Sequence, residues 1–266
     1  MISASAPAKI NLALVVGPTR EDGLHELATI LQRIELADVV SLEPAPALEI
    51  DGFADDTIVR AALEAVAAAA GVEPAWRARI EKRIPVAAGL GGGSSDAATA
   101  IRLACRLLPD PPGPGVLHGI ATSLGVDVAF FLAPGSQLGT GDGSTLTPIE
   151  LPGDYTVLLL LPHAETKSST GEVYLRFDRE EGFDERRAAV LEIAAAGRGA
   201  DLAALPPNDL ARSALSARLR GLGAFRADVS GAGPTLYGLF AQRDAAERAA
   251  EAVAPLGEVW VTRPAW

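Results

Sequence analysis

The chain has 266 residues, a formal net charge of −11 at pH 7 and a hydrophobic fraction of 48%. This length suits one large or two small domains with a sizeable buried core. The single cysteine, Cys105, excludes a disulfide framework and a cysteine-based zinc site, and the acidic balance argues against nonspecific binding to nucleic acid or anionic membrane. Residues 1–11 lack the apolar core of a signal peptide, and the purest apolar run, 157–161, is far too short to span a membrane, so we expect a cytoplasmic protein.

Hydrophobic periodicity and breaker residues predict an alternation of strands and helices along the chain. In the first half we expect strands over 10–16, 39–42 and 76–81 and helices over 56–70, from Ser94 or Ser95 as cap to about 108, and over 116–124. In the second half we expect strands over 155–161, 225–230, 235–240 and 258–262 and helices over 172–177, 184–196, 213–220 and 243–253. The order favours an α+β fold, with a boundary near the Pro-Gly break at residue 152.

A glycine-rich segment between a predicted strand and a predicted helix is the sharpest feature of the sequence. Residues 85–98 read PVAAGLGGGSSDAA, with four glycines in five positions followed by two hydroxyls. Missing Cβ atoms let backbone N–H groups approach an anion, and the helix N-terminus adds its positive dipole end. The segment is neither a Walker A loop nor a Rossmann GxGxxG. It predicts a phosphate cradle, and the alternative is a glycine-rich connection with a serine cap.

Three other short segments hold candidate residues. Lys9 and Asn11 lie two apart in a predicted strand and so share one face, and the chain has only three lysines against twenty arginines. Asp127 is a lone acid in an apolar stretch, which is rare unless the acid is paired or functional. Small residues at 230–235 allow close backbone approach between two predicted strands. The structural alternatives are a surface lysine, a cap or ion pair at Asp127, and a tight hairpin.

Together these segments resemble the three ordered motifs of the GHMP kinase superfamily. The matching stretches are PAKINL at 7–12, PVAAGLGGGSSDAA at 85–98 and SGAGPTLYGLF at 230–240, so the resemblance covers essentially the whole chain. It implies a two-domain α+β fold. Residues 1–152 would form a nucleotide-binding domain like domain 2 of ribosomal protein S5, and residues 153–266 a ferredoxin-like α/β domain.

The resemblance also implies an ATP-dependent phosphotransferase that uses Mg²⁺. Its catalytic pair falls on Asp127 as general base and Lys9 as the orienting, charge-stabilising partner. The resemblance places the ATP triphosphate on the glycine-rich segment, through Pro85, Ala87, Gly89, Leu90, Gly91, Gly92, Gly93, Ser94 and Ser95. Ser95, or an acid near the loop, is a candidate for the metal ligand, and the sequence does not settle which.

One segment separates branches of the superfamily. Residues 20–27, REDGLHEL, look like the R-x-DGYHEL of kinases that phosphorylate the 2-hydroxyl of 4-diphosphocytidyl-2-C-methyl-D-erythritol in the non-mevalonate isoprenoid pathway, and the stretch 208–210 adds support. The resemblance then implies a substrate pocket formed by Asn11, Leu24, His25, Thr170, Tyr174, Gly231 and Gly233.

The sequence departs from that pattern at two places. Leu24 replaces the tyrosine that stacks on cytosine, and Asp56–Thr57 stands where the family often has Asn-Leu beside the adenine. The alternatives are therefore a mevalonate- or homoserine-type GHMP kinase and a non-catalytic homologue that binds a nucleotide or sugar. We expect small-molecule ligands and neither nucleic acid nor membrane as partners, and the sequence leaves monomer or homodimer open.

Overall fold

The computed structural model describes the chain except for residues 54–56, 164–172, 175–176 and 178–180. Its strands are β1 (Ile2–Thr19), β2 (His25–Pro44), β3 (Glu49–Asp51), β4 (Trp76–Glu81), β5 (Ser136–Gly141), β6 (Thr145–Ile149), β7 (Thr156–Pro162), β8 (Arg226–Val229), β9 (Leu236–Phe240) and β10 (Gly257–Thr262). Its helices are α1 (Thr57–Ala70), α2 (Gly92–Leu107), α3 (Pro114–Leu124), α4 (Val126–Leu132), α6 (Phe183–Ala196), α7 (Leu215–Gly221) and α8 (Arg243–Val253), with short 3₁₀ turns at Gly197–Gly199, Leu202–Ala204 and Ala254–Leu256. The expected α+β mixture is confirmed.

Two compact units interleave along the chain. The first comprises residues 1–8, 36–86 and 91–134, and the second comprises 9–35, 87–90 and 135–266. The long strands β1 and β2 each contribute residues to both units, and so does the glycine-rich segment. This division differs from two consecutive stretches of chain, and the boundary near residue 152 stays a prediction.

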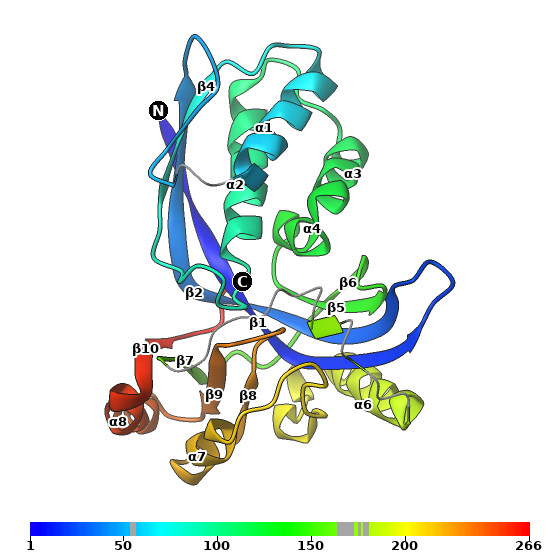
Figure 1. The fold of residues 1–266 in the computed structure, drawn as a ribbon, viewed down its shortest axis with the longest axis vertical. Coiled ribbons are helices and arrows are strands. Elements are labelled where there is room, and N and C mark those ends of the chain that lie inside the picture. Colours follow the sequence, from blue (N-terminus) through cyan, green and yellow to red (C-terminus); the bar gives the residue numbers. More distant parts are fainter. Residues whose placement is uncertain (54–56, 164–172, 175–176, 178–180) are drawn as a thin grey trace. The chain divides into compact units, whose positions relative to one another are not determined.

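The first unit packs helices on one face of a small sheet. β4 pairs antiparallel with the Val39–Pro44 part of β2 and parallel with β3. Along β4, Trp76, Ala78 and Ile80 are buried while the residues between them are exposed, which confirms the alternation expected there. Helices α1, α2, α3 and α4 pack against one another on one side of these strands (Figure 1).

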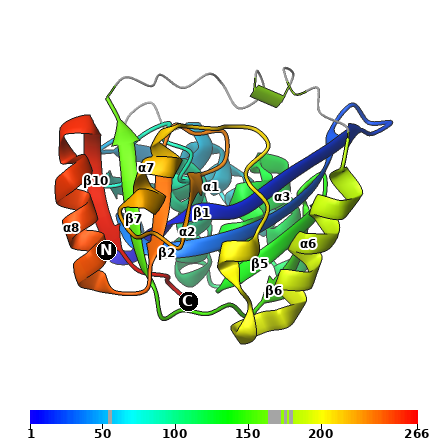
Figure 2. The same ribbon diagram turned by 90° about the horizontal axis from the view of Figure 1, so that it is seen from below.

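The second unit contains two sets of antiparallel strands. The Leu27–Leu31 part of β2 pairs with β5, and β5 continues into the hairpin with β6. The other set has the order β10-β7-β9-β8 and is antiparallel throughout. Figure 2 shows α8 lying along β10 and β7 and α7 beside β8 and β9. This arrangement agrees with the ferredoxin-like half expected from the resemblance.

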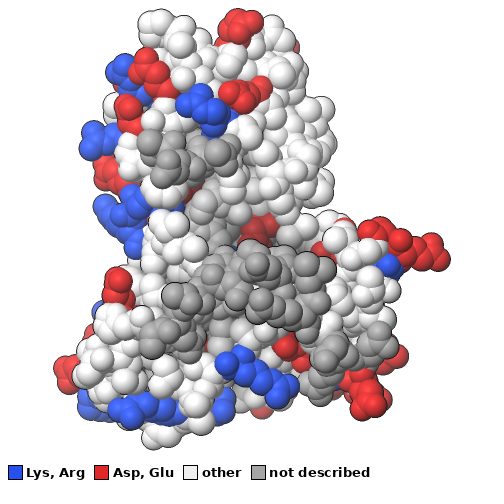
Figure 3. Space-filling model, viewed as in Figure 1, with Lys and Arg blue, Asp and Glu red and all other residues white. Residues whose placement is uncertain are grey.

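Charged side chains of both signs are mixed on the surface. On the face drawn in Figure 3, Lys and Arg side chains lie next to Asp and Glu side chains at many points. Arg77, for example, lies within 3.9 Å of Glu43, 2.6 Å of Glu49 and 3.7 Å of Asp51. Within the described residues, no helix is both long enough and apolar enough to cross a membrane.

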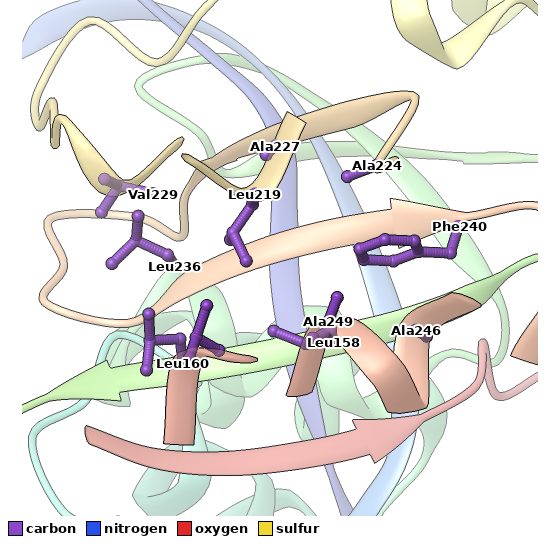
Figure 4. Packing of buried hydrophobic residues seen from close by; sticks show 11 residues of the cluster. Leu158, Leu160, Leu219, Ala224, Ala227, Val229, Leu236, Phe240, Ala246 and Ala249 are labelled. Carbon is purple, nitrogen blue, oxygen red and sulfur yellow. The ribbon is translucent and has the colours of Figure 1, made fainter. Parts of the chain in front are cut away.

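The four-stranded sheet and its helices enclose an apolar core. Leu158 and Leu160 of β7 and Leu236 of β9 are fully buried, and Ala246 and Ala249 of α8 pack on them (Figure 4). The spacing of three residues between the two alanines puts both on one face of α8, which confirms the predicted amphipathic helix. Small side chains on that face let the helix approach the sheet closely.

Several predicted elements need correction. The strand expected over 39–42 is only the end of β2, because residues 27–34 are buried at every position and show no alternation to reveal the rest. The short strand β3 and the seven-residue helix α4 were not expected, since each is too short for a periodic pattern. Of the helix expected over 172–177, residues 172, 175 and 176 lie outside the described residues, and Val173 and Tyr174 are helical.

Candidate active site

The glycine-rich segment starts α2 without a side-chain cap. Gly91, the residue before the first turn, has φ 71° and ψ 20°, a left-handed conformation that favours glycine. Ser94 and Ser95 lie inside the helix, and the Ser95 N–H already donates to the Gly91 carbonyl oxygen at 2.9 Å. The expected serine cap is therefore wrong, because the N-cap is Gly91, three or four residues earlier than Ser94 or Ser95. The first N–H groups of a helix have no partner within it, so this end is suited to an anion.

The neighbouring glycines have different surroundings. A Cβ on Gly92 would lie 3.1 Å from Ile84 Cγ2 and 3.3 Å from Lys82 Nζ, which is tighter than ordinary contact. Among the described residues, a Cβ on Gly93 would meet only Ile58 Cδ1, at 3.8 Å. Gly92 therefore serves the packing of its own unit. Gly93 instead leaves backbone uncovered at the start of the helix, as a phosphate cradle requires.

Ser95 offers a buried hydroxyl at the same end of α2. The residue is fully buried, and among the described residues its Oγ has no hydrogen-bond partner. Buried polar atoms in native proteins are nearly always satisfied, by protein, water or ligand. An orphan hydroxyl in the first turn of this helix therefore suits an oxygen of a phosphate or a hydrated cation.

A buried ion cluster underlies the loop, and the sequence reasoning missed it. Lys82 Nζ donates to Asp38 Oδ2 at 2.5 Å and to Asp96 Oδ2 at 2.7 Å, and both carboxylates are fully buried. Asp38 also accepts from the N–H groups of Arg83 and Ile84. Burial alone would lower the pKa of Lys82, but the hydrogen bonds to the two carboxylates outweigh it and the pKa lies above its usual value. The scarcity of lysine in the chain was the signal that could have drawn attention to Lys82.

In the second unit, Lys9 and Asn11 lie together as the strand spacing predicts. Both are nearly buried, and Lys9 Nζ donates to Asn11 Oδ1 at 2.7 Å. Asn11 Nδ2 donates to Thr29 Oγ1, whose hydroxyl donates to the Ala13 carbonyl. This chain of bonds fixes the amide so that its oxygen faces Lys9. The interpretation of Lys9 as an ordinary surface lysine is thereby excluded.

The turn at 230–235 packs against the same strand. A Cβ on Gly231, which has φ +59°, would lie 3.3 Å from Asn11 Oδ1 and 3.6 Å from Lys9 Nζ. Ser230 Oγ accepts from the Asn11 N–H and donates to the Gly89 carbonyl oxygen. The close backbone approach expected of this segment is therefore present, and Gly231 leaves room beside the ammonium. Gly233 also has a positive φ, +79°.

Residues 87–90 of the glycine-rich segment are held by this second unit. The Lys9 N–H donates to the Leu90 carbonyl oxygen at 2.9 Å, and the Thr235 N–H donates to the Ala88 carbonyl oxygen. A Cβ on Gly89 would lie 2.6 Å from the Ser230 carbonyl oxygen, so only glycine fits. Ala87 has φ 56° although it carries a side chain. Such strain persists only where surrounding contacts impose it, and it is common at ligand sites.

His25 lies in an aromatic cluster that includes one expected pocket residue. Its ring stacks on Tyr174 with centroids 6.1 Å apart, and Phe177 meets it edge-on at 5.6 Å. His25 Nδ1 lies 2.8 Å from the Gly17 carbonyl oxygen. Because a carbonyl oxygen can only accept, Nδ1 is assigned as the donor, and in the neutral ring Nε2 is then an acceptor. Tyr174 and Phe177 also pack on the buried cluster of Leu14, Val16 and Leu27, so the tyrosine has a core role as well.

The remaining expected residues are not brought together by the described structure. Leu24 is 52% exposed at the β1–β2 hairpin, Thr170 lies outside the described residues, and Pro85 belongs to the first unit. Asp127 is the second residue of α4, half-buried and just before a fully buried stretch. Because Lys9 and Asp127 belong to different units, their pairing stays a prediction.

Comparisons with known proteins give one consistent result. Family models match at residues 57–135 (GHMP kinases N terminal domain) and 193–257 (GHMP kinases C terminal). A 4-diphosphocytidyl-2-C-methyl-D-erythritol kinase of Anaeromyxobacter sp. (strain Fw109-5) is 40% identical over 94% of this chain and 85% of its own length. A crystal structure of 4-(cytidine 5'-diphospho)-2C-methyl-D-erythritol kinase matches with a TM-score of 0.83 and 33% identity, covering both chains fully.

A more distant structural match shows the fold alone. Homoserine kinase from Cytophaga hutchinsonii has a TM-score of 0.76 at 17% identity, covering 99% of this chain and 95% of its own. The identity to the cytidine-substrate kinases is about twice as high, and it extends over nearly the whole chain. The chain therefore belongs to the GHMP kinases, and within them to the 4-diphosphocytidyl-2-C-methyl-D-erythritol kinase family.

Proposed function

We propose that this protein transfers the γ-phosphoryl group of ATP to the 2-hydroxyl of 4-diphosphocytidyl-2-C-methyl-D-erythritol. The observation that carries the proposal is the buried pair of Lys9 and Asn11, held against Leu90 and Gly231 in a chain of this family. The Asn11 amide oxygen orients the Lys9 ammonium, and a cation in that place suits a site where negative charge develops.

We assign the proton transfer to Asp127. A tertiary hydroxyl is crowded and weakly acidic, so a positioned base is needed. In the proposed step Asp127 takes the hydroxyl proton, and the oxygen forms a bond to the γ-phosphorus. The bond from that phosphorus to the β–γ bridging oxygen breaks, and ADP leaves. Lys9 orients the acceptor and offsets the developing charge.

The start of α2 would hold the triphosphate. The uncovered backbone at Gly93, the free first-turn N–H groups and the positive end of the helix dipole support this assignment. Phosphoryl transfer gains most of its acceleration from position and electrostatics, so a cradle that positions the triphosphate would contribute directly to the rate. Residues 87–90, held by hydrogen bonds, complete the loop.

We propose that Mg²⁺ is held chiefly by the phosphates of ATP, with Ser95 Oγ as a protein ligand. Within the described residues, no group of three or more His, Cys, Asp or Glu side chains could hold a metal ion. Mg²⁺ often binds through substrate phosphates, water and only one or two protein oxygens. When bound, it neutralises charge on the phosphate oxygens. The buried hydroxyl of Ser95 fits such a role.

We assign recognition of the cytosine to His25 and Tyr174. The acceptor nitrogen of His25 can take a hydrogen bond from the cytosine amino group, which is a donor. Tyr174 offers an aromatic face beside it. Leu24, exposed on the hairpin, covers the other face of the base less well than a tyrosine. Asn11, Thr170, Gly231 and Gly233 would line the rest of the pocket.

A coupled ADP-release assay with purified protein tests the proposal. The acceptors are 4-diphosphocytidyl-2-C-methyl-D-erythritol, mevalonate and homoserine, at equal ATP. We expect turnover with the first and none above background with the others. Faster turnover of mevalonate or homoserine would assign the activity to another GHMP branch, the alternative that the Leu24 departure leaves. Nucleotide binding without turnover of any acceptor would favour a non-catalytic homologue.

We further propose that the protein acts in the cytoplasm, where ATP is supplied, on small-molecule substrates and with neither nucleic acid nor membrane as a partner. The net charge of −11 supports the absence of nucleic acid and membrane partners. The proposed reaction is compatible with a monomer and with a homodimer. Light scattering of the protein as it elutes from a size-exclusion column distinguishes these two states.

A further inference from the structure

Asn208 is a buried polar residue in an irregular segment, and its backbone N–H and both polar atoms of its side chain have hydrogen-bond partners. It is only 2% exposed, and it precedes α7 without belonging to a helix or strand. Its N–H donates to Asp228 Oδ2 at 2.8 Å, and its Oδ1 accepts from the Leu210 N–H. Its Nδ2 donates to the Val229 carbonyl at 2.9 Å and to the Gly231 carbonyl at 2.7 Å. A fully satisfied buried amide specifies one local arrangement.

The two carbonyls that Asn208 holds lie on either side of Ser230. That residue and Gly231 form the turn that packs against Lys9 and Asn11. The turn thus links the Asn208 amide to the strand that carries Lys9, because Ser230 Oγ accepts from the Asn11 N–H and the Cβ position of Gly231 lies 3.6 Å from Lys9 Nζ. A shift of this turn would disturb Asn11, whose Oδ1 orients Lys9.

The next residue fixes the same strand from another side. The Asp209 N–H donates to the Leu14 carbonyl oxygen at 3.0 Å, and Asp209 Oδ2 accepts from the Val16 N–H at 3.1 Å. Arg186 Nε donates to that carboxylate oxygen at 3.3 Å. Adjacent side chains therefore hold the turn and the strand that carries Lys9. All of these residues belong to the second unit.

We propose that Asn208 is a positioning residue for the phosphoryl transfer, acting through Gly231 on Lys9. The proposal rests on the proposed role of Lys9. Asn208 itself reaches only protein groups, so it binds no substrate in this account. An amide is required because both partners are carbonyl oxygens: a carboxylate would lose two donated bonds and place like partial charges together.

The test compares two amide-to-carboxylate changes in the same unit. In N208D, the new carboxylate faces the carbonyls of Val229 and Gly231. In the control Q32E, it faces the carbonyls of Arg33 and Ala265, to which the fully buried Gln32 donates, with Ser136 Oγ on the other side. Both changes place a buried carboxylate against carbonyls, but only N208D lies behind the turn.

We expect N208D to lower kcat by roughly 10- to 100-fold with little change in the KM for ATP, since small misplacement of a reacting group has an effect of this size. We expect Q32E to keep kcat within about twofold at a temperature below both melting transitions, because it disturbs no reacting group. N208S, which adds no charge, replaces N208D if that variant does not fold. Equal loss of kcat in the Asn208 and Gln32 variants, or a lower melting temperature with unchanged kcat, would overturn the proposal. The assay uses whichever acceptor the wild type phosphorylates, so failure of the proposed substrate is a separate result.

Discussion

Removing the Lys82 charge should destabilise the first unit strongly. In the wild-type protein, Lys82 Nζ lies 2.5 Å from Asp38 Oδ2 and 2.7 Å from Asp96 Oδ2. In Lys82→Met, both carboxylates stay buried but lose this shared cation. Removing one partner of a buried ion pair costs about 3–5 kcal/mol, because an uncompensated charge stays in the interior. For a protein of this size each kcal/mol lowers the melting temperature by about 2–4 °C, so we expect a fall of roughly 6–20 °C.

Thermal unfolding followed by circular dichroism measures this loss. Arg77→Met is the matched control, since Arg77 lies on β4, the strand that Lys82 directly follows, and pairs with Glu49 at 2.6 Å while its side chain is 46% exposed. Exposed pairs contribute little, so this variant should melt close to wild type. Adding Asp96→Asn to Lys82→Met should restore part of the stability. If Lys82→Met melts no lower than Arg77→Met, the cluster does not stabilise the unit.

The pH dependence has a defined sign. The pKa of Lys82 is raised above its ordinary value of 10.5 in the folded protein. Its charge therefore stabilises the fold fully below pH 10.5, and this contribution is lost only as the pH rises through the higher folded value. Lys82→Met lacks this contribution at every pH, so its deficit relative to wild type should be constant below pH 10.5 and should shrink as the pH rises above that value. A deficit that stays the same well above pH 10.5 would contradict the charge argument.

The remaining predictions concern the reaction and its ligands. Asp127→Asn should lower kcat by a factor of ~100 or more, the scale expected for loss of a general base, while ATP affinity measured by calorimetry stays nearly unchanged; unchanged kcat would remove Asp127 from the mechanism. Gly93→Ala should raise the KM for ATP and leave the melting temperature unchanged. Gly92→Ala should also lower the melting temperature, because its Cβ would press on Ile84 and Lys82, 3.1–3.3 Å away. Equal melting temperatures of the two variants would refute this distinction. Leu24→Tyr should tighten binding of the cytidine substrate. Tyr174→Ala should weaken that binding by ~1–3 kcal/mol without changing the KM for ATP, by analogy with base–aromatic stacking. A weaker affinity in Leu24→Tyr would mean that the tyrosine blocks the pocket.

Local patterns in the sequence were sufficient for part of the site. Lys9 and Asn11 are two apart in a strand, and that spacing alone places them on one face, as the 2.7 Å bond confirms. The order of strand, glycines and helix likewise located the start of α2. The predicted serine cap was wrong, because the N-cap is Gly91, which has a left-handed backbone conformation and no capping side chain.

Contacts between distant segments could not be read in this way. Asn11 and Ser230 are 219 positions apart, and Lys82 meets partners 44 and 14 positions away on either side. Neither pairing follows from periodicity, because periodicity reports only which face of its own element a residue occupies. Long strands buried on both faces, such as residues 27–34 of β2, hide even that signal.

The residues that break local rules gather in the parts of the chain assigned to chemistry. Lys9 is a nearly buried lysine, Asn208 a buried amide outside regular structure, and Ala87 a non-glycine residue at φ 56°. Each feature costs free energy by itself, of order 1–3 kcal/mol for the strained backbone. Such costs persist in a folded protein only where neighbouring contacts offset them and function requires the geometry. In the second unit the offsetting contacts are identifiable. Lys9 bonds to Asn11, both polar atoms of the Asn208 side chain have partners, and hydrogen bonds to Ala88 and Leu90 hold the chain just after Ala87. The Asn208 and Gln32 variants separate positioning from stability because both place a buried carboxylate against carbonyls and only the Asn208 variant adjoins the turn beside Lys9.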